Sequence, residues 1–596
     1  ETKMVSVTPQ DAAQLNVRHP RLWWPVQMGE ANLYDLHLEF RANGGVSDAN
    51  DSKFGIRQVT SEMTPEGARL FKINGKNVLI RGAGWTPDMM LRTSPERQEQ
   101  EMQYVKAMNL NTIRLEGKLE DEHFFDLADQ FGLLVMPGWC CCDLWEQWQA
   151  WEPKQVQTAG DSLHDQIMRL RSHPSVFVWL YGSDNPPTAD VERMYLKILQ
   201  DAQWPNPSIS SAAAKPTTVT GPSGVKMSGP YDWVAPNYWL TDTKHGGAYG
   251  FNTETSPGPA VPPIQSLKKF IPADHLWPID DVWNYHTGGG EFSDIHLFTD
   301  ALNARYGKPN SAEDLARKSQ WMTYEGERAM FEAYRRNKYT STGVVQWMLN
   351  NAWPSLIWHL YDYYLLPGGG YFGTKKANEP LHIQYSYDDR SIAVVNDTQQ
   401  SFGNLTASAE VYDTQMHKLF SNTQKLNAGP DSTQGVFNIP EQQQVSGTYF
   451  VKLRLADAHG KPVSDNFYWL SSKPDVSEFE KSEWYYTPVS QYADFTDLQK
   501  LPQAQIAVNS RALPASNGRN TTEITLRNTG QALAFGIELR LVKSEDQDDV
   551  LPAMWEDNYI ALLPGESKTV HVSYTTQSGG ASPHVIWTAA NVAAGQ

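Results

Sequence analysis

Between residues 70 and 385, short apolar runs alternate with longer stretches in which apolar residues recur every three or four positions. Arg97–Met108, Glu122–Phe131 and Ala312–Arg335 have this second spacing, which is typical of amphipathic helices. Strands and helices that alternate over about 300 residues predict a (β/α)8 TIM barrel, whose active site lies at the C-terminal ends of the strands. The predicted strands are Val78–Arg81, Thr112–Leu115, Leu133–Met136, Val176–Leu180, Val234–Tyr238, Ala248–Asn252 and Val344–Leu349.

The regions on either side of the barrel have the alternating pattern of half-buried strands. We expect residues 1–65 to be the C-terminal part of an immunoglobulin-like β-sandwich, completed by a separate N-terminal segment of the same protein. After residue 385 the helical spacing disappears, and runs such as Gly447–Leu455 and Thr521–Asn528 predict strands. The predicted fold is therefore multidomain α/β plus all-β, with a central barrel at 66–385, a β-sandwich at 386–475 and a C-terminal immunoglobulin-like β-sandwich at 476–596.

Composition narrows the choice of partners. The chain has 596 residues, too many for one hydrophobic core, and a net charge of -18. Nucleic acid is an improbable partner because phosphate binding needs concentrated positive charge, whereas a cationic polymer would be attracted. No apolar run is long enough for a membrane-spanning helix, so no membrane association is expected.

Cysteine usage gives no sign of a disulfide framework or a metal site. The three cysteines are consecutive, at Cys140, Cys141 and Cys142, and no second pair of ligands stands at metal-binding spacing. We therefore expect them to be packing residues after a strand, and we expect neither a metal nor a cofactor.

Polar residues that follow the predicted strands are the candidates for chemistry. They are Glu116, Ser183, Asp184, Tyr238 and Glu254. A glycosidic bond is broken by two carboxyl groups on opposite sides of the anomeric carbon, and Asp184 and Glu254 follow two different strands. Asp184, which precedes Asn and two prolines, could instead initiate a turn or cap a helix, and Glu254 could be a surface residue. Together, at the same end of one barrel, they favour a catalytic pair.

Other features leave alternatives open or exclude whole mechanisms. Glu116 could form a salt bridge with Arg114 or Lys118, or bind the ammonium group of an aminosugar. Aromatic residues make up 11% of the chain and could stack on sugar rings or simply form the core. There is no Gly-x-Ser-x-Gly, His-Glu-x-x-His, Walker or Gly-x-Gly-x-x-Gly motif, so acyl transfer, zinc proteolysis and nucleotide chemistry have no support.

Several motifs together resemble glycoside hydrolase family 2, and within it the exo-β-D-glucosaminidase branch. They include Trp23-Trp-Pro25, Phe71-x-Ile-Asn-Gly75, Asn111–Gly117, His173-Pro-Ser175 and Phe251–Thr255. Most of the family carries Asn-Glu where this chain has Ser183-Asp184, and the glucosaminidase branch resembles this chain in carrying Ser-Asp. A serine leaves room near C2 of the sugar for an ammonium group. In one position the chain departs from its relatives, because Cys140 replaces an expected acidic residue after Trp139.

The resemblance assigns roles to individual residues. Asp184 is the implied general acid/base and Glu254 the implied nucleophile of a retaining double displacement, with carboxyl groups roughly 5 Å apart. Arg114 is expected to orient Glu254, with Tyr238 as a hydrogen-bond partner, and Asp88 to reach the outer hydroxyls. The remaining expected sugar contacts are Glu116, Ser183, Tyr238 and Trp347, with Trp353 and Trp358 as possible pocket walls.

The implied activity is hydrolysis of β-1,4-linked D-glucosamine from the non-reducing end of chitosan or chitooligosaccharides. Two alternatives remain open at this point: a β-mannosidase-like activity on neutral sugars or N-glycan cores, and a carbohydrate-binding scaffold without turnover. Because chitosan is an extracellular polymer, a secreted or periplasmic location is expected.

Overall fold

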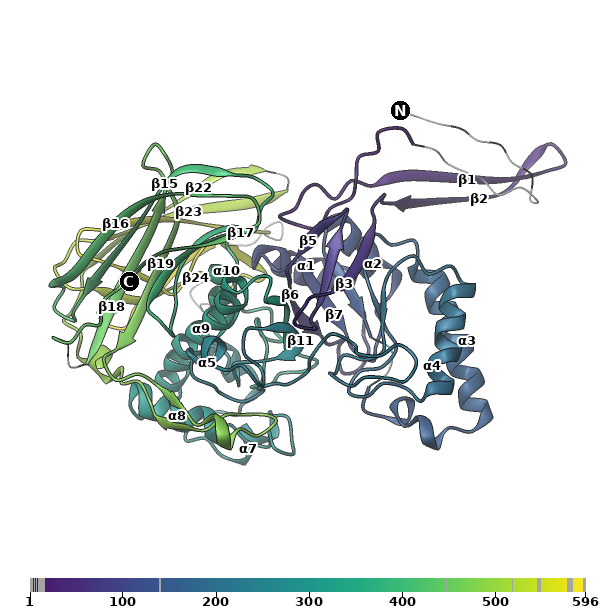
Figure 1. Ribbon diagram of the computed structural model, residues 1–596. Helices are drawn as coiled ribbons and strands as arrows, with labels where there is room; N and C mark the ends of the chain where they lie inside the picture. The colour runs from purple at the N-terminus through teal and green to yellow at the C-terminus, as the bar shows by residue number, and fades with distance from the viewer. Residues whose placement is uncertain are drawn as a thin grey trace.

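The computed structural model describes residues 4, 6, 8, 17–138, 141–445, 447–516, 518–543, 548–575 and 583–592. A barrel lies at the centre, a long hairpin projects from one side of it, and two β-sandwiches pack against the other side (Figure 1). The predicted combination of a TIM barrel with immunoglobulin-like sandwiches is confirmed.

The barrel is built on a parallel five-stranded sheet in the order β11-β12-β6-β7-β8. Its strands are β6 (Ile80–Trp85), β7 (Thr112–Leu115), β8 (Leu134–Pro137), β11 (Gly250–Thr255) and β12 (Ser341–Gln346). A parallel bridge from Gly138 to Leu180 adds β9 (Trp179–Leu180), which pairs with β10 (Ser208–Ile209). On the other edge, Lys226 forms a parallel bridge with Asn252 of β11. Because all these strands run in one direction, their C-terminal ends share one face of the barrel.

Local sequence signals set the helix boundaries. Helix α1 (Pro95–Ala107) begins where Ser94 accepts a hydrogen bond from the Arg97 amide. Helix α2 (Glu122–Phe131) begins at an Asp121 cap and ends at Gly132, which has a φ of 71°. The other long helices are α3 (Pro153–Leu170), α4 (Ala189–Asp201), α8 (His296–Tyr306), α9 (Ala312–Arg336) and α10 (Gly369–Ala377). None of the helices within the described ranges combines the length and apolarity needed to span a bilayer.

One predicted strand, Val234–Tyr238, is wrong. Residues 234–237 form no strand, and Tyr238 begins the short helix α5 (Tyr238–Thr241). Instead, the segment around Lys226 lies beside β11. That segment is too short, and too rich in glycine and serine, for its apolar pattern to indicate a strand.

Two sandwiches follow the barrel, each made of a three-stranded and a four-stranded sheet. The first contains β13 (Leu381–Tyr385), β14 (Ser391–Asn396), β15 (Phe402–Tyr412), β16 (Lys418–Ala428), β17 (Ser432–Asn438), β18 (Thr448–Ala456) and β19 (Pro462–Ser471). The second contains β22 (Ile506–Ser516), β23 (Arg519–Asn528), β24 (Ala534–Val542), β25 (Ala553–Trp555), β26 (Ile560–Leu562), β27 (Ser567–Tyr574) and β28 (His584–Thr588). Their inner faces are buried and their outer faces more exposed, as the alternating sequence pattern predicts.

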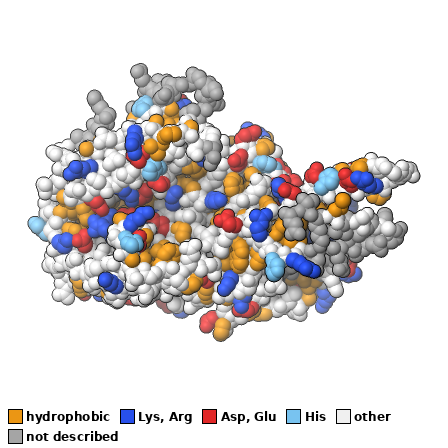
Figure 2. Space-filling model, turned by 90° about the horizontal axis from the view of Figure 1, so that it is seen from above, with side chains coloured by type: hydrophobic (Ala, Val, Ile, Leu, Met, Phe, Trp, Pro, Cys, Tyr) orange, Lys and Arg blue, Asp and Glu red, His pale blue; other side chains and the backbone are white. Residues whose placement is uncertain are grey.

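Before the barrel, β1 (Tyr34–Ala42) and β2 (Gly45–Phe54) form an antiparallel hairpin that projects away from the rest of the molecule (Figure 1). Charged and histidine side chains cover much of it (Figure 2). Leu38 and Phe40, which lie on the same face, are 53% and 55% exposed. The next strand, β3 (Val59–Met63), pairs with β4 (Arg69–Ile73) and belongs to the barrel side.

Helix α9 joins the barrel to both sandwiches. Trp321 of α9 packs against Phe535 of β24, with ring centroids 5.2 Å apart, and Trp469 of β19 packs against the same ring at 5.3 Å. Nearly every residue of α9 is buried, so this helix packs against neighbouring elements on all sides. One hydrophobic cluster therefore runs from the barrel helices into the second sandwich and includes Phe450 and Trp469 of the first, which otherwise has a core of its own.

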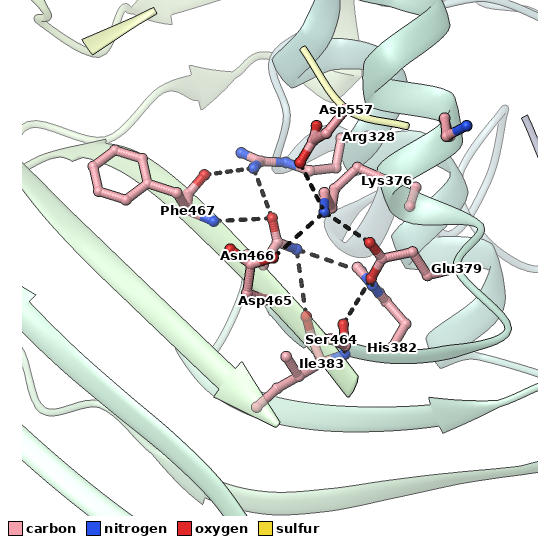
Figure 3. Close-up of polar contacts among 12 residues, drawn as sticks. Arg328, Lys376, Glu379, His382, Ile383, Ser464, Asp465, Asn466, Phe467 and Asp557 are labelled. Atoms are coloured by element: carbon pink, nitrogen blue, oxygen red, sulfur yellow. Dashed lines mark hydrogen bonds and ion pairs between the residues drawn. The ribbon is translucent and has the colours of Figure 1, made fainter. Parts of the chain in front are cut away.

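Polar contacts reinforce this junction (Figure 3). Lys376 of α10 lies 3.9 Å from Asp465 of β19 and 3.6 Å from Asp557 of the second sandwich. Arg328 of α9 donates a hydrogen bond of 3.0 Å to Asn466. Buried charges of this kind are tolerated only when they are paired. The pairs therefore restrict how the helices and the two sandwiches can pack against each other.

A second buried cluster connects the first barrel strand to the first sandwich. Asp397, 8% exposed, accepts hydrogen bonds from Arg81 of β6, from Arg335 at 2.8 Å and from Lys338 at 2.6 Å. Burial alone would raise the pKa of Asp397, but the charges of Arg335, Arg81 and Lys338 hold it below its ordinary value.

Replacing Asp397 with Asn should lower the free energy of unfolding by about 3–5 kcal/mol, because it leaves buried cations without their counter-charge. The measurement is denaturant unfolding at neutral pH, with Asp190→Asn as control, since the Asp190 side chain is 97% exposed. Because the pKa of Asp397 is lowered in the folded state, its stabilising contribution is present above the unfolded pKa and lost as the pH falls. Equal stability of the two variants would contradict this role.

Candidate active site

Asp184 and Glu254 line the same pocket, which has a volume of about 510 Å³. Asp184 follows β9, and Glu254 lies near the C-terminal end of β11. The pocket therefore opens at the face of the barrel where the strands end, as the sequence predicted. Its size lies within the range of cavities that enclose small-molecule ligands.

Arg114 of β7 is the centre of the polar contacts behind the pocket. It is 1% exposed and donates a hydrogen bond of 2.6 Å to Glu254 and one of 2.7 Å to Glu116. It also donates to the Ser183 hydroxyl at 3.0 Å and to the Thr253 carbonyl at 3.1 Å. The contact with Glu254 matches the orienting role expected for Arg114. One guanidinium thus positions groups from β7, from β11 and from the loop after β9.

Glu116 and Ser183 lie beside Arg114, one layer behind the pocket wall. The Ser183 hydroxyl donates a short hydrogen bond to Glu116, whose side chain is 11% exposed. The salt bridge between Glu116 and Arg114, considered from the sequence, is therefore present. Neither Glu116 nor Ser183 is among the described residues that line the pocket, so contact with a sugar stays a prediction for both.

The charges around Glu254 are unbalanced. Burial raises the pKa of Glu254 above its ordinary value, and the nearby charge of Glu116 raises it further. Arg114 and a hydrogen bond from Tyr231 oppose these effects. Burial also raises the pKa of Asp184, again with a contribution from Glu116. A site where several carboxyl groups share one guanidinium favours the binding of another cation.

The hydrogen-bond partner of Glu254 was wrongly predicted as Tyr238. That side chain is 1% exposed, and its hydroxyl accepts a hydrogen bond of 3.0 Å from the Gly246 amide. Tyr231 takes its place and lines the pocket. Tyr231 follows the Lys226 segment, which forms a single bridge to β11 and no strand, so the sequence pattern gave no sign of it.

Glu146 is a further residue that the sequence did not indicate. Its carboxylate accepts hydrogen bonds from the backbone amides on both sides of Asp184, at 3.2 Å from Ser183 and 2.7 Å from Asn185. It also accepts one of 3.3 Å from the Cys142 amide. Glu146 is only 9% exposed, so this clamp fixes the backbone that carries Asp184.

The interpretation of the cysteines as packing residues is wrong for two of them. Cys141 and Cys142 form a disulfide between adjacent residues, and the Cys141 sulfur lies 3.9 Å from a carboxylate oxygen of Asp184. Disulfide prediction from sequence considers cysteines that are far enough apart to close a loop, and two neighbouring cysteines close none. Cys140 and Trp139 lie outside the described residues.

Among the residues that the structure describes, two groups of acidic, cysteine or histidine side chains lie close enough to hold an ion. The first contains Asp184 with Cys141 and Cys142, but disulfide sulfurs are not thiolate ligands. In the second, both ring nitrogens of His173 already bond to carboxylates, at 2.8 Å from Asp129 and 3.0 Å from Glu122. Neither group has the free donors that a metal site needs.

Trp347 forms part of the pocket wall directly after β12. The Arg114 guanidinium lies 5.7 Å from its ring centroid. Gly84 of β6 lies under the ring, where a Cβ atom would approach to 2.7 Å, so only glycine leaves space for the indole. Of the two other candidate walls, Trp358 lines the pocket, whereas Trp353 stacks on His286 with ring centroids 4.9 Å apart.

Asp88 does not lie on the pocket wall. It accepts hydrogen bonds of 3.0 and 2.9 Å from Arg92 and one of 3.2 Å from the Tyr363 hydroxyl. The hydrogen bond and charge of Arg92 hold the pKa of Asp88 well below its usual value. Asp88 is not among the described residues that line the pocket, so its expected contact with the outer hydroxyls stays a prediction.

The segment between the two sandwiches also reaches the pocket. Ser482, Glu483 and Trp484 line it together with Phe292 from the barrel. The backbone amides of Tyr231 and Asp232 both donate hydrogen bonds of 2.8 Å to the Tyr485 carbonyl, which holds this segment against the loop that carries Tyr231. Sequence patterns cannot foresee this contact, because it joins regions about 250 residues apart by tertiary packing alone.

Comparison with known proteins identifies the family of each part of the chain. Residues 67–202 match the family description "Glycosyl hydrolases family 2, TIM barrel domain", and residues 1–57 match "Glycosyl hydrolases family 2". Residues 388–473 match "Mannosidase Ig/CBM-like domain", and residues 484–592 match "Exo-beta-D-glucosaminidase Ig-fold domain".

Individual relatives support the same family assignment. The exo-beta-D-glucosaminidase of Streptomyces avermitilis is 41% identical over 98% of this chain and 67% of its own length. That of Amycolatopsis orientalis is 41% identical over 95% of this chain and 57% of its own length. The crystal structure of Amycolatopsis orientalis exo-chitosanase CsxA matches with a TM-score of 0.93 and 39% identity, over 97% of this chain and 70% of that one. The chain therefore belongs to glycoside hydrolase family 2, in its exo-β-D-glucosaminidase branch.

Proposed function

We propose that this chain hydrolyses β-1,4-linked D-glucosamine from the non-reducing end of chitosan or chitooligosaccharides, with retention of the β configuration. The chain spans 57% and 67% of the length of the two relatives compared above, so the activity of a whole enzyme is assigned here as a proposal. The observation that carries it is the common pocket of Asp184 and Glu254, with Arg114 and Glu116 behind it.

Asp184 has the environment of a proton donor. Burial and the charge of Glu116 raise its pKa, which keeps the carboxyl group protonated at higher pH than an ordinary aspartate. In the first step it would protonate the glycosidic oxygen as Glu254 attacks the anomeric carbon. In the second step it would accept a proton from the water that releases the sugar from Glu254.

Glu254 must be ionised to attack. Arg114 and Tyr231 stabilise the carboxylate, while burial and Glu116 oppose its ionisation. A sugar that carries an ammonium group would add a positive charge at this point and lower the pKa of Glu254. A neutral sugar does not lower this pKa. The charges of the neighbouring carboxyl groups, which oppose the ionisation of Glu254, therefore favour the binding of an aminosugar. This distinguishes the proposal from a β-mannosidase activity.

The location and the N-terminal hairpin lead to two further parts of the proposal. Because chitosan is a large extracellular polymer, we place the activity in a secreted or periplasmic protein. We also propose that a separate N-terminal segment of the same protein packs on the hairpin β1–β2, which is supported by the exposed apolar side chains of Leu38 and Phe40.

Wild-type protein should release glucosamine from chitobiose, and Glu254→Gln should abolish turnover because an amide cannot act as the nucleophile. Asp184→Asn should lower kcat by about 10²–10⁴-fold on substrates with poor leaving groups. Product analysis by chromatography, with aryl β-D-glucosaminide and aryl β-D-mannoside compared side by side, checks both points. Preference for the mannoside, or sustained turnover in Glu254→Gln, would refute the assignment.

Glu116→Gln should move both limbs of the pH profile of kcat/KM to lower pH. The charge of Glu116 raises the pKa of Glu254, which sets the acidic limb, and that of Asp184, which sets the basic limb, so its removal lowers both. Loss of its charge should also reduce kcat/KM for a glucosaminide by roughly tenfold or more, the value of a charge-assisted hydrogen bond. Glu99→Gln, an exposed residue of α1, is the control. Limbs that stay in place or move upward would contradict the electrostatic role.

Glu146→Gln should lower kcat more than it changes KM, because it loosens the backbone that positions Asp184. The loss should be large for chitobiose and small for a glucosaminide with an activated leaving group, which needs little protonation. Asp161→Asn, on the exposed face of α3, serves as the matched control. An equal loss for both kinds of substrate would indicate a purely structural role.

A further inference from the structure

A disulfide lies beside the carboxyl group that is proposed to donate the proton. Cys141 and Cys142 are bonded to each other, and the Cys141 sulfur lies 3.9 Å from a carboxylate oxygen of Asp184. No other side chain within the described ranges comes as close to that carboxylate as a hydrogen bond requires. A sulfur in a disulfide carries no proton, so it cannot donate a hydrogen bond to Asp184. The contact is therefore apolar and adds to the burial of the carboxyl group.

The same disulfide is connected to the backbone of Asp184 through Glu146. The Cys142 amide donates a hydrogen bond of 3.3 Å to the Glu146 carboxylate. Glu146 also accepts hydrogen bonds of 3.2 Å and 2.7 Å from the amides of Ser183 and Asn185. A movement of the Cys142 backbone therefore affects the clamp that holds both amides next to Asp184.

The backbone of Cys142 has a conformation that needs support. Its φ is 65°, in the left-handed region that residues other than glycine rarely adopt. The bond between the two neighbouring side chains restrains the peptide unit that joins Cys141 to Cys142. Once that bond is broken, Cys142 is free to relax to an ordinary conformation, and its amide then leaves Glu146.

The disulfide is accessible to a reductant from solution, because Cys142 is exposed and Cys141 is half-buried. A thiolate of a dithiol attacks one sulfur, and the second thiol of the same molecule completes the exchange. The sulfur–sulfur bond breaks, the protein gains two electrons and two protons as two thiols, and the dithiol becomes a disulfide. In an oxidising compartment, such as the secreted location proposed above, the protein disulfide persists.

We propose that the disulfide of Cys141 and Cys142 positions the general acid, and that its reduction by a dithiol switches the enzyme to a less active form. In the reduced form the Cys141 thiol donates a hydrogen bond to the Asp184 carboxylate. This bond favours the ionised carboxylate and lowers the pKa of Asp184. The loosened clamp of Glu146 also leaves the carboxyl group less well placed. The inference rests on the proposed function and adds regulation to it.

Other titratable groups also surround Asp184. Glu116, Arg114 and Lys215 act on its pKa through their charges, and Glu146 lies behind its backbone. Across the pocket are Tyr231, His245, Glu254 and Glu483. These groups are present in both redox forms, whereas the new thiols themselves titrate at about pH 8.5. A serine variant, which donates a hydrogen bond without titrating, therefore belongs to the test.

The first experiment compares untreated wild-type protein with protein reduced by dithiothreitol. EDTA is present throughout, because free thiols and Asp184 could together bind a metal ion. Thiol titration of unfolded protein should find one free thiol before reduction and three after it, since the chain has three cysteines and two are paired. Reduction should lower kcat for chitobiose by roughly tenfold and change KM little. An activated aryl glucosaminide, which needs little protonation, should be affected much less, and reoxidation should restore activity.

Two double variants separate the new hydrogen bond from the loss of the disulfide. Cys141→Ser with Cys142→Ser should move the basic limb of the pH profile of kcat/KM down by about 0.3–1 pH unit, because a serine hydroxyl donates to the Asp184 carboxylate. Cys141→Ala with Cys142→Ala should lose activity on chitobiose through the loosened clamp, with a smaller shift of the limb. Neither variant should respond to dithiothreitol. Three free thiols in untreated protein, unchanged activity after reduction, or equal losses for both substrates would overturn the switch.

The inference and the proposed function fail in different ways. If untreated wild-type protein released no glucosamine, the proposed function would be refuted, and the switch would be judged without activity. Reduction of the disulfide and ionisation of Asp184 are linked, so each favours the other by the same factor. Asp184→Ala should therefore shift the equilibrium with dithiothreitol toward the disulfide by about two- to tenfold, as measured by thiol titration. Asp190→Ala is the control, because the Asp190 side chain is 97% exposed. Equal equilibria in wild type and Asp184→Ala would overturn the inference.

Discussion

The site depends on one buried cation, the guanidinium of Arg114. A buried arginine is costly unless its charge is met, and here Glu254 and Glu116 meet it together. The reverse also holds, because two neighbouring carboxylates at the end of a barrel would repel each other without a shared cation. Arg114 therefore makes it possible for Glu116, directly after β7, and Glu254 of β11 to occupy one small volume, and Ser183 joins them from the loop after β9.

The balance around Arg114 explains why the site suits a positively charged sugar. One guanidinium only partly compensates Glu116, Asp184 and Glu254, as the raised pKa values of the last two show. In the proposed function, the ammonium group at C2 of a glucosamine supplies the missing positive charge. The proposed specificity then arises from a deficit of charge that the fold maintains, since Glu254 lies on β11, Glu116 directly follows β7, and Glu146 fixes the loop that carries Asp184.

Much of the fold was predictable because local patterns agree with the packing. The strand Thr112–Leu115 and the helix Glu122–Phe131 were predicted with the bounds that the structure shows, since strong apolar periodicity and an Asp121 cap define them. Tyr238 was misassigned because the segment before the true partner, Tyr231, forms only a single bridge at Lys226 and leaves no strand pattern. The sequence therefore identifies acidic residues that follow strands more accurately than it identifies functional residues in irregular loops.

Other parts of the site arise only from tertiary structure. Glu146 acts through backbone amides of a distant loop, and no sequence pattern records which amide a carboxylate will bind. Trp484 reaches the pocket because the segment between two sandwiches folds back on the barrel. The disulfide of Cys141 and Cys142 joins neighbours and closes no loop, so spacing rules pass over it.

Chemical rescue tests the central claim, that Asp184 and Glu254 act from opposite sides of one sugar ring, most directly. With azide and an activated β-glucosaminide, Asp184→Ala should form the β-glucosaminyl azide, because Glu254 still makes the covalent intermediate and azide then attacks from the side of the missing acid. Glu254→Ala should instead form the α-azide, because azide takes the place of the nucleophile. Proton NMR of the two products distinguishes them. The same anomer from both variants, or no rescue of either, would contradict the account.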